Sequence, residues 1–165
     1  MYGVLDVINS GSAMELDERT LGMIKEVVKE KNIHTLWFEA HFMYRKQLAK
    51  FAEQFDGVEV KFRCGVESFD GQLREQWKKG VAANVTVADV AKHFQGVCLL
   101  CCTKGDTKER ILRDIAFAEQ YFEYASVNVF CENSTSVKRD NDLAKWFVGE
   151  VYPTLKQSKK IEILI

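Results

Sequence analysis

Several features that define large classes of protein are missing from this sequence. No apolar run approaches the ~18 residues of a membrane-spanning helix, and the chain does not open with the basic and apolar segments of a secretory leader. Its 23 Lys and Arg residues are balanced by 24 Asp and Glu residues, so the net charge is only −1. General nucleic-acid binding therefore has no electrostatic support. We expect a cytoplasmic protein without a membrane partner, whose substrate is either a small molecule or of unknown class.

Common cofactor and metal motifs are missing as well. No glycine-rich stretch has the GxGxxG or GxxxxGK[ST] spacing of dinucleotide and P-loop sites. The histidines, His34, His41 and His93, do not have the spacing of a two-histidine metal site. His41 follows Glu39 at the end of an apolar run, where it is either a polar site residue or the start of a solvated helix.

The five cysteines are expected to be reduced thiols, because no leader directs the chain to an oxidising compartment. Four of them fall in apolar, strand-like runs. Cys98 and Cys101 form a CxxC, but alternate side chains of a strand point to opposite faces, so these two thiols diverge. We interpret the cysteines as small buried residues and expect no metal ligands in this chain. They are Cys64, Cys98, Cys101, Cys102 and Cys131.

The composition that is present suits one folded domain. Apolar residues make up 47% of the chain and aromatic residues 12%, which excludes an intrinsically disordered protein. A chain of 165 residues has the length of a single domain, which we place at 1–165.

One pattern repeats along this domain: a short β-branched run, a polar loop and an amphipathic helix. The predicted strands cover residues 2–8, 33–39, 58–64, 97–102, 126–131 and 161–165, and the helices end near residues 31, 55, 79, 93, 122 and 152. Asp17 is the expected N-cap of the first helix. Asp106 and Glu109 have capping-box spacing, and Pro153 predicts a helix boundary.

Strict alternation of strands and helices predicts an α/β fold with a parallel sheet. Two architectures satisfy it, an open doubly wound sheet and a partial (β/α) barrel. Small or polar residues follow all five of the first strands, and a barrel gathers every such loop at one mouth, so the pattern favours the barrel. A complete eight-stranded barrel needs at least ~200 residues, so about six repeats would leave it open.

Three short segments at strand ends are candidates for ligand binding. Glu39 and Glu67 each close an apolar strand, where a carboxylate must be hydrated or paired. They either bind ligand hydroxyl or amino groups, or form ion pairs with nearby arginines. Residues 10–12, Ser-Gly-Ser, either offer amides and hydroxyls to a carboxylate or form a plain turn.

These segments also resemble motifs of a known family. Residues 62–70, FRCGVESFD, followed by a KG pair at 79–80, resemble the fourth-strand segment of radical S-adenosylmethionine (SAM) proteins, which commonly reads G-[IV]-[EQ]-[ST]-x-x-[DE]. Residues 9–12, NSGS, are similar to the second-strand loop of the subgroup with SGS in place of GGE. Residues 105–109, GDTKE, are similar to the G-x-T-x-[ED] after the fifth strand.

The resemblance implies a partial barrel with SAM lying across the strand ends. In the family, a [4Fe-4S] cluster held by a CxxxCxxC loop reduces SAM, and the resulting 5′-deoxyadenosyl radical takes a hydrogen atom from the substrate. Carried over by motif, the cofactor-binding residues would be Ser10, Gly11, Ser12, Glu39, Glu67 and Arg74.

This sequence departs from the family in one respect: it has no CxxxCxxC. It starts directly in what would be the second strand, so we expect a truncated radical SAM protein whose cluster belongs to the complete protein only. No catalytic residue is assigned and no activity is expected of this chain alone. The alternative is a non-catalytic α/β domain that binds a ligand or a partner. Because the first strand of the family's fold is missing, strand 2–8 would be an open, apolar sheet edge, and strand 161–165 would be the opposite one. Two such edges predict a homodimer or other self-association.

The cysteine placement leads to a first prediction. After anaerobic reconstitution with iron and sulfide, this chain should keep sub-stoichiometric iron through desalting, because no loop brings three thiols together. Iron and sulfide assays with an absorbance spectrum measure this. A stable band near ~400 nm with about four irons per chain, as thiolate-held clusters give, would contradict it.

Overall fold

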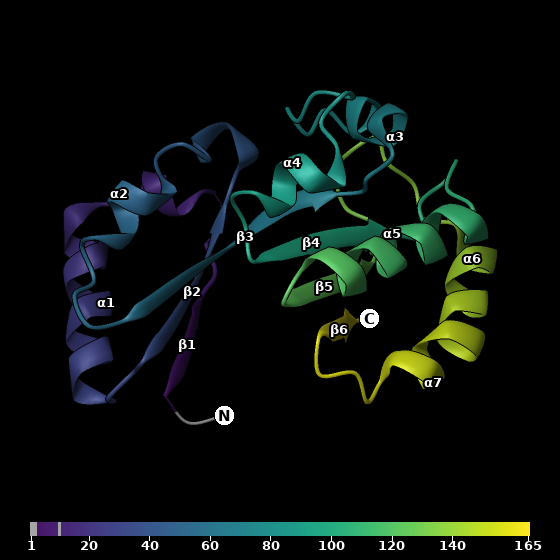
Figure 1. Ribbon diagram of the computed structural model, residues 1–165. Helices are drawn as coiled ribbons and strands as arrows, with labels where there is room; N and C mark the ends of the chain where they lie inside the picture. The colour runs from purple at the N-terminus through teal and green to yellow at the C-terminus, as the bar shows by residue number, and fades with distance from the viewer. Residues whose placement is uncertain (1–2, 10) are drawn as a thin grey trace.

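The computed structural model describes residues 3–9 and 11–165 and contains a single six-stranded sheet (Figure 1). All neighbouring strands pair in parallel, in the order in which they occur along the chain. The strands are β1 (Val4–Val7), β2 (Thr35–Ala40), β3 (Glu59–Glu67), β4 (Gly96–Cys101), β5 (Tyr124–Val129) and β6 (Ile161–Leu164).

Helices connect the strands and lie outside the curled sheet (Figure 1). They are α1 (Glu18–Glu30), α2 (Leu48–Ala52), α3 (Gly71–Gln76), α4 (Val87–Ala91), α5 (Lys108–Tyr121), α6 (Asn141–Trp146) and α7 (Tyr152–Leu155). Two short 3-10 turns, η1 (Ala13–Glu15) and η2 (Phe42–Tyr44), follow β1 and β2, and a π-helical turn, η3 (Phe147–Val151), joins α6 to α7.

The strand order decides between the two predicted architectures. A doubly wound sheet reverses its strand order at a switch point, whereas this order runs from β1 to β6 without reversal. Right-handed crossovers that always step the same way put every helix on one face. The result is a curled half-barrel, as the sequence predicted, and the alternative of an open doubly wound sheet is wrong.

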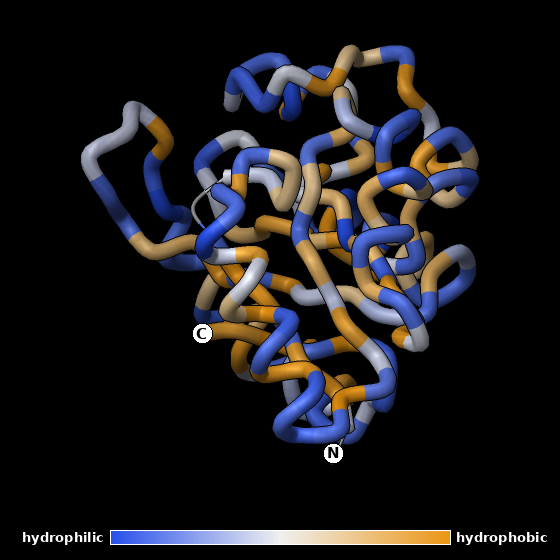
Figure 2. The backbone as a smooth tube through the Cα atoms, turned by 90° about the vertical axis from the view of Figure 1, so that its left-hand side faces the viewer, coloured by the Kyte–Doolittle hydropathy of each residue, from blue (hydrophilic) through white to orange (hydrophobic). Residues whose placement is uncertain are grey.

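The outer face of the sheet carries the hydrophobic core. In β2, Leu36, Phe38 and Ala40 are buried against the helices, while the alternate residues face the concave side. Phe38 packs edge-on against Phe51 of α2, with ring centroids 5.2 Å apart. Figure 2 shows hydrophobic segments in the interior and hydrophilic ones around the outside of the chain.

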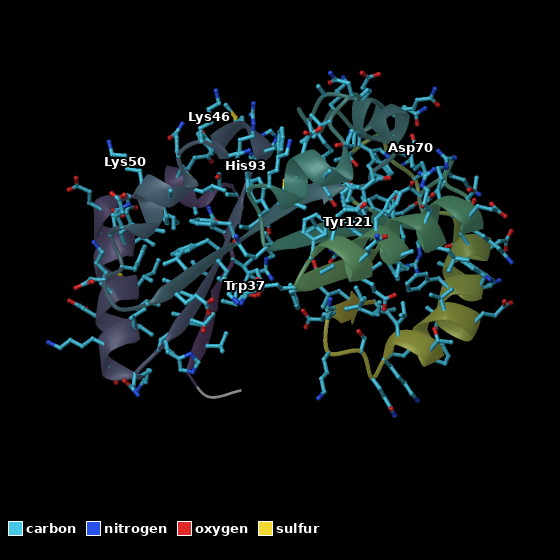
Figure 3. The ribbon with its side chains drawn as sticks, in the orientation of Figure 1. Trp37, Lys46, Lys50, Asp70, His93 and Tyr121 are labelled. Atoms are coloured by element: carbon cyan, nitrogen blue, oxygen red, sulfur yellow. The ribbon has the colours of Figure 1, made fainter. Side chains whose placement is uncertain are left out.

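Large polar and aromatic side chains fill the amino end of the concave face, and we call this group the barrel floor: Asp6, Trp37, Arg63 and Tyr124. Trp37 of β2 lies between the two halves of the sheet (Figure 3) and its ring centroid is 5.7 Å from that of Tyr124 on β5. Arg63 is 4% exposed, and its guanidinium donates to Asp6 of β1 at 2.5 Å. The floor therefore ties β1, β2, β3 and β5 together across the curl.

Helix ends follow local capping chemistry, with two corrections to the sequence predictions. Asp17 caps α1 as expected, accepting a hydrogen bond from the Thr20 amide at 2.7 Å. The capping box predicted for Asp106 is wrong. Thr107 is the N-cap of α5, and the Asp106 carboxylate accepts a hydrogen bond from the Thr107 amide.

The boundary predicted at Pro153 is also wrong. The helix continues through η3 into α7, where Pro153 occupies the first turn. A proline is tolerated there because its missing N–H would have had no partner within that turn. None of the described helices is long and apolar enough to cross a membrane.

The barrel floor leads to a prediction about Gly96, the first residue of β4. A Cβ at this position would lie 3.0 Å from both the Trp37 ring and the Tyr124 carbonyl, and 3.2 Å from the Arg63 Cβ. Gly96→Ala should therefore lower the free energy of unfolding by about 1–3 kcal/mol, the usual effect of overpacking. Gly22→Ala is the control: Gly22 lies within α1 with nothing near its absent Cβ, so it should stabilise by about 0.5–1 kcal/mol. Urea denaturation measures both, and an equal effect of the two substitutions would contradict the packing argument.

The sheet edges lead to a prediction of self-association. Among the described residues, β1 pairs only with β2 and β6 only with β5. Ile8 beside β1 is 72% exposed, and Ile165 beside β6 is 61% exposed. Open apolar edges pair with other chains, so light scattering should show dimers or larger species, with a mass that falls over a hundredfold dilution. Ile8→Lys should weaken this association and Ile8→Val should not. A monodisperse monomer of the wild-type chain at every concentration would refute the prediction of self-association.

Candidate functional site

The loops after β1, β2 and β3 meet around one pocket of about 330 Å³ at the carboxyl ends of the strands. It brings together four of the predicted site residues, Gly11, Ser12, Glu39 and Glu67, and it is the feature we call the mouth pocket. Ser10 lies outside the described residues. The complete lining is Gly11, Ser12, Glu15, Glu39, His41, Met43, Gly65, Glu67 and Lys79.

The loop after β1 is folded by its own side chains. The Ser12 amide donates to the Glu15 carboxylate at 3.4 Å, and the Glu15 amide donates to the Ser12 carbonyl at 2.8 Å. A Cβ on Gly11 would overlap the Glu15 carboxylate, so glycine permits this close turn. The Ser12 side chain is buried and its Oγ accepts from the His41 amide at 3.3 Å. The loop is thus fixed against the end of β2.

Glu39 is a half-buried carboxylate with weak protein partners. It stands beside Arg63 in the β2–β3 register, and the Cys98 thiol donates to its Oε2 at 3.9 Å. The pKa of the Glu39 carboxyl lies above its ordinary value, mainly because the group is buried. The nearby Glu67 charge raises this pKa as well, and the Arg63 charge opposes the rise. A carboxylate in this position favours a ligand that donates hydrogen bonds or carries positive charge.

Glu67 ends β3 in an unusual backbone conformation. The β3–β4 register shifts between Cys64 and Glu67, and Glu67 has a φ of 65°, in the left-handed region that side chains rarely adopt. The sequence predicted a loop from residue 65 onward, whereas the strand continues to Glu67 through this bulge. Its Oε1 lies 2.6 Å from Lys79 Nζ. Glu67 therefore forms an ion pair, one of the two alternatives that the sequence offered, but its partner is Lys79 rather than an arginine.

Arg74 lies away from the mouth pocket. It is 0% exposed, and its guanidinium donates to the carbonyls of Ala82, Ala83 and Val85 at 2.8–3.1 Å. Burial lowers the pKa of Arg74 from its ordinary value. It holds the segment after α3 in place, so the expectation that it contacts a cofactor is corrected to a structural role.

His41 and Lys79 are site residues that the sequence did not assign. His41 caps η2, its Nδ1 accepting from the Met43 amide at 3.1 Å, and its Nε2 lies 2.8 Å from the Lys79 carbonyl. The KG pair at 79–80 contains Lys79 and was the available signal for it. His41 lies in no predicted motif, and its position shortly after Glu39 was the one signal for it.

A second pocket of about 500 Å³ adjoins the first on the β4–β6 side. Glu67 and Lys79 line both pockets, so their ion pair forms part of the shared wall. Polar and apolar groups alternate around this second pocket. Besides the ion pair, the lining consists of Leu100, Asn128, Val129, Phe130, Cys131, Asn133, Leu164 and Ile165.

The cysteines do not fit an iron–sulfur cluster. Such clusters need several convergent thiolates, but four of the five thiols are buried, and in the described part of the chain no three His, Cys, Asp or Glu side chains converge on a metal position. Burial raises the pKa of the Cys98 thiol to about 12 and that of Cys64 further. These residues therefore favour neutral thiols that serve as packing.

Comparison with known proteins gives an informative match among solved structures. No family model and no curated protein matches the sequence. Among solved structures, the fold is similar to that of a queuine lyase from Clostridium spiroforme bound to SAM and queuine, with a TM-score of 0.90 and 36% sequence identity. The match covers 99% of this chain and 70% of that one. The queuine lyase is a radical SAM enzyme, and this chain therefore belongs to the radical SAM family, as the motifs of residues 9–12, 62–70 and 105–109 implied.

Proposed function

We propose that this chain is the SAM-binding part of a radical SAM protein and that SAM binds in the mouth pocket. The observation that carries the proposal is that a relative matching 99% of the chain has SAM bound. The residues of the pocket support it, because they complement the functional groups of SAM. A pocket of about 330 Å³ also lies within the range of ~300–1,000 Å³ typical of small-molecule sites.

The cationic parts of SAM have complementary groups in the pocket. The carboxylate of the methionine part would reach the loop at Gly11 and Ser12 only by displacing the Glu15 carboxylate, which accepts from the Ser12 amide and lies against Gly11. Glu39 and Glu67 would face the cationic amino and sulfonium groups and the ribose hydroxyls, which are donors or positive charges. Lys79 would orient the Glu67 side chain through their contact at 2.6 Å.

No step of the radical chemistry is assigned to the residues of this chain. The [4Fe-4S] cluster that reduces SAM in this family would belong to the complete protein, since the cysteines described here do not fit it. The chain alone would then bind SAM without cleaving it. The non-catalytic binding domain, the second candidate, shares this behaviour and differs only in lacking a cluster-bearing partner segment.

We further propose that the second pocket receives the substrate, and that the substrate is a fused heteroaromatic base of the queuine class. The relative is bound to queuine as well as to SAM. The amides of Asn128 and Asn133 would pair with ring and exocyclic groups, and Phe130 would contact the ring face. Asn128 already donates to the Leu99 carbonyl at 3.1 Å, so its oxygen is the part left for a ligand.

Isothermal titration calorimetry with SAM tests the proposal. Wild-type chain should bind SAM, and Glu39→Gln and Glu67→Gln should each weaken binding by about tenfold or more, the usual effect of losing a hydrogen bond to a charged group. The matched control is Glu26→Gln, an exposed position on α1 that should leave the affinity unchanged. Because the pKa of Glu39 is raised, its carboxylate is lost at a higher pH than that of an ordinary glutamate. Acidification should therefore weaken SAM binding more in wild type than in Glu39→Gln.

Two results would refute the assignment. If wild-type chain shows no heat of SAM binding, the mouth pocket does not suffice for the cofactor. If binding is present but equal in both glutamate variants and the control, SAM binds elsewhere. Titration of queuine into the SAM-loaded chain tests the substrate class in the same way, with guanine as the comparison base.

A further inference from the structure

We propose that His41 is a positioning residue of the mouth pocket: in one fixed neutral tautomer, its ring pins the Lys79 backbone and thereby places the Lys79 ammonium on Glu67. This inference rests on the proposed SAM site and deepens it. Sequence reasoning left His41 undecided between a site residue and the start of a helix. The contacts of its ring decide the question in favour of a role at the site.

Both ring nitrogens of His41 are used, in opposite roles. The Met43 backbone N–H points to Nδ1 at 3.1 Å, and an N–H can only donate, so Nδ1 carries no proton. Nε2 lies 2.8 Å from the Lys79 carbonyl, which can only accept, so Nε2 carries the proton. The neutral Nε2–H tautomer is therefore the one form of the ring that satisfies both contacts.

The Lys79 segment begins at a residue with an unfavourable backbone conformation. Lys78 has a φ of 54°, in the left-handed region that is costly for a residue with a side chain, whereas Gly80 adopts its φ of 68° without that cost. The Lys79 amide donates to the Arg74 carbonyl at 3.1 Å, and its carbonyl accepts from His41. A Cβ on Gly80 would lie 3.3 Å from Nε2, so glycine also gives the ring its close approach.

The restraint reaches the pocket through Lys79. The Nζ of this residue is 2.6 Å from Glu67 Oε1, and both side chains line the two adjoining pockets. The His41 amide also donates to Ser12 Oγ at 3.3 Å. His41 thus connects the loops after β1 and β2 with the segment after α3 through hydrogen bonds. Without the ring, the strained segment would relax and the ammonium would leave Glu67.

Protonation of His41 would undo this arrangement. It would turn Nδ1 into a donor that faces the Met43 N–H, and two donors repel.

A double-mutant cycle measured by SAM calorimetry tests the proposal. His41→Asn keeps a hydrogen-bond acceptor that can cap η2, because the asparagine side-chain oxygen replaces Nδ1 and asparagine is a good N-cap, but this side chain is too short to reach the Lys79 carbonyl. Lys79→Met removes the ammonium. Each single variant should weaken SAM binding by about tenfold, and the double variant should bind no more weakly than Lys79→Met alone, because both changes break one connection. The control is Lys78→Met, an exposed neighbour, which should bind SAM as wild type does.

The coupling itself separates positioning from general loss of structure, because a general structural defect in His41→Asn would add to the effect of Lys79→Met. Additive effects in the cycle would overturn the proposal while leaving the SAM site intact. Absence of SAM binding in wild type overturns the proposed function and this inference with it.

Discussion

The packing of Trp37 against Tyr124 across the concave face is the constraint on which the rest of the structure depends. These rings stand on β2 and β5, yet their centroids are 5.7 Å apart, a distance that a flat sheet could not give. Gly96 leaves room for both rings, and Arg63, held by Asp6, fills the space beside them. Because the floor fixes the curl at the amino ends, the carboxyl ends converge enough for loops from β1, β2 and β3 to share one pocket.

Much of the fold could be predicted from local sequence. Alternation of apolar runs with amphipathic helices gave all six strands, and polar residues after consecutive strands favoured a barrel over a doubly wound sheet. Glu39 and Glu67 were found for a simple reason: a carboxylate at the end of an apolar strand is conspicuous. The length of β3 was not predictable, because the bulge before Glu67 depends on pairing with β4.

The errors share one physical cause, which is that tertiary contacts decided between equivalent local choices. Asp106 and Thr107 are both good caps, and the structure uses the threonine. Arg74 lies between the family-like segments 62–70 and 79–80, but its guanidinium donates to the carbonyls of Ala82, Ala83 and Val85 and is not free for a ligand. His41 carried no pattern of its own, since its partner, the Lys79 carbonyl, is 38 residues away and is a backbone group that every residue possesses.

The wall between the two pockets has a consequence for how ligands bind. Glu67 and Lys79 neutralise each other there, and each faces both cavities. A ligand that bound the Glu67 carboxylate in one cavity would weaken its contact with Lys79 and so change the charge exposed in the other cavity. Ligands bound on the two sides of this ion pair would then be coupled, and thermodynamic linkage would make the coupling equal in both directions.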